Sequence, residues 1–188
     1  MKIELEQVKP MEIERRSFEI ITRELEQAGK TLQPGTELIV KRCIHTSADF
    51  DYADNLLFSP GAVEQALDAI REGADIVTDT QMAKAGINKR ALARFGGQVH
   101  CFMSDEDVAK AAREAGSTRA AACMDKAAAL GDNFIYAVGN APTALVRLYE
   151  LLQEGKIVPR LIIGVPVGFV NVVASKELIM QTHTPWIV

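Results

Sequence analysis

The sequence has few cysteines and histidines, and none of them stand at the spacing of a metal site. The three cysteines, Cys43, Cys101 and Cys123, are an odd number and include no C-x-x-C pair. Such a set argues against both a disulfide framework and a zinc ribbon. The three histidines also show no H-E-x-x-H or other ligand spacing. We therefore expect reduced thiols and no bound metal.

Long apolar runs are also missing. Apolar residues make up 48% and charged residues 24% of the 188 residues, close to the averages for globular proteins, and no run is long enough to cross a bilayer. The first 21 residues have charges every few positions and no apolar segment of the kind found in secretory signals. These features predict a cytoplasmic protein without a membrane partner.

The chain has no excess of basic residues and no nucleotide-binding motif. A net charge of −4 gives no reason to expect nucleic acid as a partner. The motifs G-x-G-x-x-G, G-x-x-x-x-G-K-[ST] and G-x-S-x-G are absent, so no cofactor is indicated. If the ligand is an anion, helix N-termini, backbone N–H groups and a few arginines must recognise it locally.

What the sequence does contain is an alternation of apolar runs and helical segments. A helix is predicted over 10–29, where Ile13, Phe18, Ile21 and Leu25 recur at helical spacing. Continuous apolar runs are typical of strands that are buried on both faces, and they occupy residues 37–44, 74–79, 98–103, 133–139, 160–168 and 185–188. Helical segments that begin near Ser, Asn or Pro occupy residues 59–73, 88–96, 104–116, 117–131 and 141–155. We predict one α/β domain with a doubly wound, mostly parallel sheet of five to six strands flanked by helices.

In such a sheet, ligands bind at the carboxyl ends of the strands. His45 follows the first run, so we expect it at this edge as a general acid or base, although a histidine there also serves as a polar cap. His100 and His183 are interpreted as structural. Three neighbours of His45 have side chains that can orient an imidazole nitrogen: Thr46, Ser47 and Asp49.

Residues after the later runs give further candidates, each with an ordinary structural alternative. Asn140 is expected as the N-cap of a helix whose free N–H groups bind an anion, with simple capping favoured on this segment alone. Thr80 caps the next helix, or Asp79 acts there as a base. Gly164 and Gly168 allow close approach of a flat ligand, or they only form a tight turn.

Arg119 stands at the start of a predicted helix. A cation in this position opposes the helix dipole, and this locally unfavourable placement suggests an anionic partner.

Taken together, several segments resemble the precorrin-8X methylmutase family of cobalamin biosynthesis, which includes the cobalt-precorrin-8 methylmutases. The matching segments extend in order from about Pro10 to Val188, and they are RSFEI, IHTSADFDYADNLLFS, GADIVTDTQMAKAGI, GNAPTAL and PRLIIGVPVGFVNVVASKE. The resemblance implies an isomerase that moves a methyl group from C11 to C12 of a corrin precursor without a methyl donor. It also implies a homodimer.

The resemblance assigns roles to individual residues. His45, in the family's histidine motif, is implied as the proton donor, and imidazole suits proton transfer near neutral pH. The resemblance implies a tetrapyrrole substrate with many carboxylates, for which the candidate binding residues are Arg16, Ser17, Thr46, Thr80, Arg119, Asn140, Gly164, Gly168 and Phe169. Relatives of this kind continue past the final strand with a glycine-rich stretch and a helix, so we expect the domain over 1–188 to lack that segment.

Two alternatives remain open at this point. The substrate is either cobalt-precorrin-8, giving cobyrinate, or the cobalt-free precorrin-8X, giving hydrogenobyrinate. The residues of the segment IHTSADFDYADNL favour the cobalt form. A non-catalytic corrinoid carrier would use the same pocket without turnover.

Overall fold

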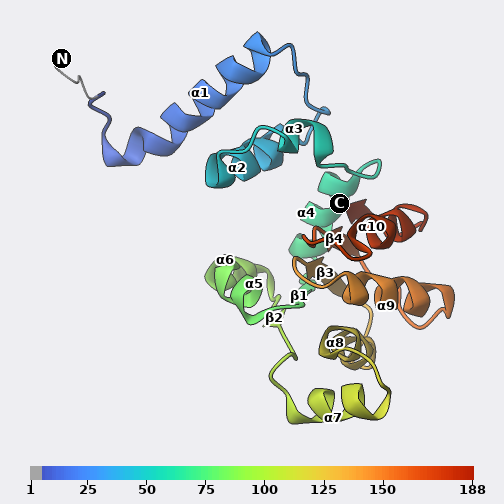
Figure 1. Cartoon of the computed structure of the whole chain (residues 1–188). Coiled ribbons are helices and arrows are strands. Elements are labelled where there is room, and N and C mark those ends of the chain that lie inside the picture. Colours follow the sequence, from blue (N-terminus) through green and yellow to red (C-terminus); the bar gives the residue numbers. More distant parts are fainter. Residues whose placement is uncertain (1–5) are drawn as a thin grey trace, which may run out of the picture. The chain divides into compact units, whose positions relative to one another are not determined.

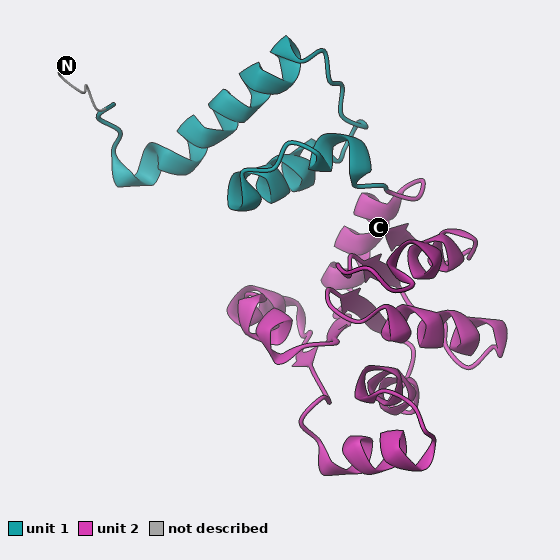
Figure 2. Ribbon diagram, viewed as in Figure 1, with its two compact units in different colours: residues 1–57 teal, residues 58–188 magenta. Residues whose placement is uncertain are grey.

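The computed structural model describes residues 6–188 of the chain. These residues fall into two compact units that divide after Leu57, shown in different colours in Figure 2. The first unit is helical and the second contains the sheet (Figure 1).

The first unit consists of short and medium helices. They are η1 (Pro10–Glu12), α1 (Ile13–Gln27), α2 (Glu37–Ser47) and α3 (Tyr52–Asn55). Helix α1 packs against α2 and buries Ile21 and Leu25, which are four residues apart and so share one helix face. The helix predicted over 10–29 is thereby confirmed, with a 3-10 turn as its first part.

The prediction of a strand over residues 37–44 is wrong, because this segment forms most of α2. Val40 and Ile44, four residues apart, are buried on one face, whereas Leu38 is 74% exposed. A run that would be buried on both faces as a strand is thus buried on one face as a helix. His45 consequently lies in the last turn of α2 and does not follow a strand.

The second unit contains a five-stranded sheet in which all strands are parallel. The strands are β1 (Asp75–Thr78), β2 (Val99–His100), β3 (Phe134–Val138), β4 (Leu161–Gly164) and β5 (Trp186–Ile187), in the spatial order β2-β1-β3-β4-β5. The order reverses direction at β1, as in a doubly wound sheet. Five of the six predicted strands and the predicted fold class are confirmed.

Helices connect these strands. They are α4 (Ala62–Arg71), α5 (Gln81–Gly86), α6 (Lys89–Leu92), η2 (Ala93–Phe95), α7 (Glu106–Glu114), α8 (Arg119–Ala128), α9 (Pro142–Gln153) and α10 (Val172–Met180). Side-chain oxygens of Thr80, Asn88 and Thr118 accept backbone N–H groups at the starts of α5, α6 and α8. The sequence position of Thr80 and Asn88 predicts this, whereas Thr118 takes the capping position one residue after the predicted start at Ser117. No helix within residues 6–188 is both long and apolar enough to span a bilayer.

The main core of the second unit lies between one face of the sheet and helices α7 to α10. Tyr136 on β3 and Ile162 on β4 point into it, where Met124, Leu145 and Leu148 of the helices are fully buried. Helices α8, α9 and α10 pack side by side in this layer, and α4 packs against β4 (Figure 1). Burial on both faces explains why β3 and β4 are continuous apolar runs without alternation.

The outer edge of β5 is covered by the first residues of the same unit. Phe58 forms an antiparallel bridge with Ile187. The backbone N–H of Ser59 donates to the Trp186 carbonyl, and the Trp186 N–H donates to the Ser59 hydroxyl, each at 2.9 Å. The polar backbone groups of this edge are thereby satisfied.

Candidate active site

His45 lies in the last turn of α2 and is half-buried beside an aromatic ring of α1. The imidazole meets Phe18 edge to face, with ring centroids 5.8 Å apart and an interplanar angle of 75°. No described residue forms a hydrogen bond with either ring nitrogen, although burial of the side chain is only partial. The imidazole is therefore held by packing and keeps both nitrogens available for proton transfer.

Two charged side chains complete the group around Phe18. The Arg42 guanidinium lies over the Phe18 ring, 5.0 Å from its centroid, and pairs with Glu14 at 2.7 Å. Arg42 lowers the pKa of the Glu14 carboxyl through this hydrogen bond and its charge, with a smaller contribution from His45. We call Glu14, Phe18, Arg42 and His45 the imidazole cluster. Phe18 and Arg42 were not predicted as partners of His45, although Phe18 stands in the RSFEI motif.

The expected orientation of His45 by its sequence neighbours is wrong. The hydroxyl of Thr46 donates to the carbonyls of Arg42 and Cys43, and that of Ser47 donates to the Cys43 carbonyl. Asp49 instead accepts the backbone N–H of Asp51. In a helix, hydroxyl side chains bond the carbonyl three or four residues earlier, which turns them away from the next side chain.

Two predicted binding residues on α1 already have partners. Arg16 pairs with Glu6 at 2.6 Å and with Glu19 at 3.3 Å, and these carboxylates raise its pKa. The Ser17 hydroxyl donates to the Ile13 carbonyl. Arg16 is thus partly neutralised, and a substrate carboxylate would have to replace or share these ion pairs.

In the second unit, the carboxyl edge of the sheet is organised by a buried carboxylate. Asp79 follows β1 and is 1% exposed. Its oxygens accept the backbone N–H groups of Gly139, Asn140 and Ala141, which follow β3, at 3.0, 2.9 and 2.7 Å. The N-terminal end of α9 therefore faces an internal anion.

This arrangement corrects two predictions. The N-cap of α9 is Ala141, not Asn140, and no side chain caps it. The N–H groups expected to bind a ligand anion are occupied by Asp79, so Asp79 is a structural acceptor at this edge. Thr80 caps α5 by accepting the Ala83 N–H at 3.1 Å, as expected.

Arg119 is the first residue of α8, as the sequence predicted, and it is exposed. No described residue forms an ion pair with it. Next to it, Thr118 and Thr143 join the starts of α8 and α9 through a 2.9 Å contact between their hydroxyls. Both threonines line a cavity of about 410 Å³ that also includes Arg147 and Asn171.

The glycine-containing segment after β4 separates into a buried and an exposed part. A Cβ atom on Gly164 would lie 3.1 Å from both methyl groups of Leu145, so this glycine serves close packing of α9 and is not available to a ligand. Gly168 has φ 141°, where a side chain is strained, and Phe169 is fully exposed. Of the three residues predicted to lie against a flat ligand, Gly168 and Phe169 are at the protein surface and Gly164 is not.

The remaining histidines and the thiols have other surroundings. His100 bonds Asp75 through Nε2 at 2.7 Å, and His183 is exposed. Burial raises the pKa of the Cys123 thiol to about 12, with a further contribution from Cys101. Within residues 6–188, no group of three or more His, Cys, Asp or Glu side chains is placed to hold a metal ion.

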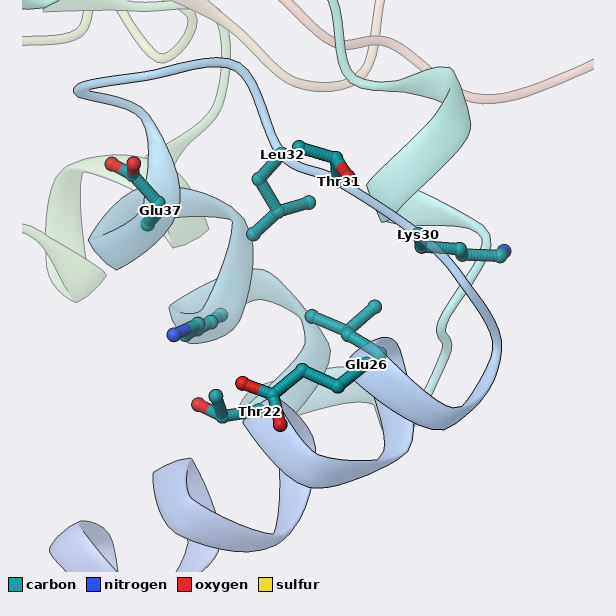
Figure 3. Close-up of a pocket in the computed structure, with 8 residues that line it drawn as sticks. Thr22, Glu26, Lys30, Thr31, Leu32 and Glu37 are labelled. Atoms are coloured by element: carbon teal, nitrogen blue, oxygen red, sulfur yellow. The ribbon is translucent and has the colours of Figure 1, made fainter.

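A separate hollow of about 300 Å³ lies in the first unit, between α1, α2 and the segment that joins them (Figure 3). Its lining mixes charges of both signs, with Glu26, Glu37 and Lys41 among the residues. It includes no residue of the imidazole cluster, so we do not assign the reaction to it.

An open, doubly wound parallel sheet with helix starts and hydroxyls along its carboxyl edge is the architecture of an α/β enzyme that binds a small molecule. The sequence matches the family model CbiC, precorrin-8X methylmutase, over residues 12–188. The chain belongs to the precorrin-8X methylmutase family, whose members are intramolecular methyl-transferring isomerases.

Individual relatives cover nearly all of the chain. The cobalt-precorrin-8 methylmutase of Salmonella typhimurium is 46% identical over 94% of this chain and 84% of its own length. That of Priestia megaterium is 43% identical over 96% of this chain and 79% of its own length. The crystal structure of a precorrin-8X methylmutase from Thermus thermophilus superposes with a TM-score of 0.84, at 40% identity over 95% of this chain and 85% of that one.

Proposed function

We propose that this protein converts cobalt-precorrin-8 to cobyrinate by moving a methyl group from C11 to C12 of the macrocycle. The observation that supports the cobalt form is the 43–46% identity to two proteins named cobalt-precorrin-8 methylmutase, over more than nine tenths of this chain. The cobalt-free reaction on precorrin-8X remains the alternative substrate to be tested.

In this proposal His45 is the acid and base. Its imidazole donates a proton to the ring system, which redistributes the π electrons so that the methyl group can migrate. It then takes back one proton to set the conjugation of the product, so no proton is consumed overall. An imidazole that no described residue engages by a hydrogen bond suits both steps, since neither nitrogen has to be released first.

The other groups bind and orient the substrate. We propose that Arg119, as a cation without an internal ion pair among the described residues, contacts a carboxylate of the macrocycle. Exposed or half-buried side chains with remaining hydrogen-bonding or apolar capacity are the other candidates: Arg16, Thr46, Thr80, Asn140 and Phe169. The Ser17 and Gly164 assignments are weakened by their internal contacts. We further propose that the protein acts in the cytoplasm as a homodimer.

The test separates chemistry from binding. In single-turnover spectra, the wild type should convert the chromophore of cobalt-precorrin-8 to that of cobyrinate, whereas His45→Ala should bind the substrate but leave it unconverted. His183→Ala, which removes an exposed histidine, serves as the control and should convert normally. Conversion by His45→Ala at the wild-type rate would remove His45 from the mechanism. A wild type that only shifts the absorption bands would indicate a corrinoid carrier.

Arg119→Ala should weaken binding of cobyrinate by about tenfold or more, because a charge-assisted hydrogen bond contributes about 1.5–3 kcal/mol. Arg113→Ala is the matched control, since Arg113 is an exposed arginine in the last turn of α7. Equal affinities of both variants in an absorbance titration would exclude Arg119 from the binding site.

A further inference from the structure

Asp79 is the only charged side chain that is buried among the described residues. It is 1% exposed, and the other buried polar side chains are neutral hydroxyls. A buried carboxylate requires full hydrogen bonding to offset the loss of water. Here the partners are three backbone N–H groups, at 2.7–3.0 Å, from residues 139–141.

Among the described residues, Asp79 is the only hydrogen-bond acceptor for the backbone N–H groups of residues 139–141. Thr78 fixes the approach of Asp79 from the other side, since its hydroxyl donates to the carbonyls of Thr80 and His100. Asp79 therefore ties the ends of β1 and β3 together at the carboxyl edge.

The carboxylate of Asp79 also interacts favourably with the dipole of α9, because it lies at the N-terminus of this helix. Negative charge is favourable at a helix N-terminus, and a 12-residue helix with Pro142 in its first turn would otherwise present this site to an anion. With Asp79 in place, a substrate carboxylate cannot use these backbone groups. What the edge exposes instead is the side chain of Asn140, which no described residue engages.

We propose that Asp79 is a positioning residue of the methylmutase: an internal anion that fixes residues 139–141 so that the Asn140 amide faces the substrate. The inference rests on the proposed function. It assigns to this part of the sheet edge a neutral hydrogen-bonding contact with the macrocycle, and it excludes a backbone anion site there. Asp79 itself does not touch the substrate.

Two variants separate the charge from the shape. Asp79→Asn keeps the shape of the side chain, but whichever way its amide turns, an NH₂ group faces at least one backbone N–H. Asp79→Ala removes the carboxylate and leaves space that formate can fill. The matched control is Asp75→Asn, because Asp75 begins the same strand and accepts the Gln98 N–H and His100 at the opposite end of the sheet.

We expect Asp79→Asn to raise the KM for cobalt-precorrin-8 about tenfold while kcat changes less than about twofold, because the charged hydrogen bonds order a binding loop. Formate should lower the KM of Asp79→Ala severalfold, whereas chloride at equal ionic strength should not. Asp75→Asn should keep the wild-type KM.

A folded Asp79→Asn with the wild-type KM would overturn the inference. It would also be overturned if formate lowered the KM of Asp79→Ala no more than chloride does. If Asp79→Ala does not fold, Asp79→Asn decides the question. Absence of turnover in the wild type would refute the proposed function instead, and the same variants would then be compared by titration with cobyrinate.

Discussion

The contact between Phe18 and His45 allows a quantitative prediction about the reaction. Replacing Phe18 by Leu keeps an apolar side chain on α1 but removes the ring that meets the imidazole edge to face at 5.8 Å. Because no described residue forms a hydrogen bond with His45, this packing is its main orienting contact. The imidazole of the variant should therefore sample more orientations, and fewer of them should suit proton transfer.

The magnitude follows from the strength of such pairs. Edge-to-face ring contacts contribute about 0.5–1.5 kcal/mol beyond the area they bury. If this orienting energy is fully lost in the transition state, kcat falls about two- to twelvefold, and KM should change little because the substrate-binding residues are untouched. Single-turnover conversion of cobalt-precorrin-8, followed by absorbance, measures the rate directly.

The control is a similar contact elsewhere. Phe102 stacks on His100 with centroids 5.9 Å apart, so Phe102→Leu removes a comparable ring from a histidine without a proposed catalytic role. It should lower stability but leave kcat unchanged. Equal rate losses in Phe18→Leu and Phe102→Leu would refute the reasoning.

Three further predictions concern stability and thiol reactivity. Gly97→Ala should lower the free energy of unfolding by about 3 kcal/mol in urea titrations, because the new Cβ would lie 2.5 Å from the Ala74 carbonyl oxygen. With a thiol pKa of about 12, Cys123 is ionised in about one molecule in ten thousand at pH 8, so native protein should resist iodoacetamide there until it is denatured. Lys126 lowers the pKa of Asp107 below 3.8, so their pairing stabilises the fold above that pH and is lost as the pH falls through the lowered value. Asp107→Asn should thus reduce Tm at pH 7, and the difference from the wild type should shrink as the pH falls below 3.8.

Each of these has an internal comparison. Gly86→Ala should be neutral or stabilising, since no atom lies within 4 Å of the added Cβ, and an equal loss in both glycine variants would contradict the clash. Rapid labelling of Cys123 in native protein would contradict its burial. A Tm difference for Asp107→Asn that persists unchanged at pH 3 would show that the ion pair is not its cause.

The strand pattern of the second unit could be predicted from the sequence because burial on both faces leaves a continuous apolar run, as in β3 and β4. The same signal failed for α2. Apart from the exposed Leu38, its apolar residues stand at 39, 40, 43 and 44, a spacing of four that places them on one helix face, but a short run does not distinguish this from a buried strand. The position predicted for His45 was therefore wrong, so a strand end no longer supports it as the candidate acid, and the family motif does.

The role of Asp79 could not be predicted for a different reason. Its partners lie 60 to 62 residues later in the sequence, and they become neighbours only because β1 pairs with β3. The sequence indicates a carboxylate and a helix start separately, but their pairing depends on strand order. Close packing at Gly164 is likewise visible only once Leu145 of α9 is placed over it.

The bridge between Phe58 and Ile187 has a consequence for how the second unit folds. After β1 and β2, the sheet grows at one edge in the order in which the strands are synthesised, first β3, then β4, then β5. That growing edge has unpaired backbone groups until Phe58 and Ser59 pair with Trp186 and Ile187, a contact that closes a loop of well over a hundred residues. Long-range closure is slow, so the nascent chain should expose an unpaired strand edge for most of its synthesis. Because such an edge is prone to aggregation, we expect a chaperone to bind the chain at that stage.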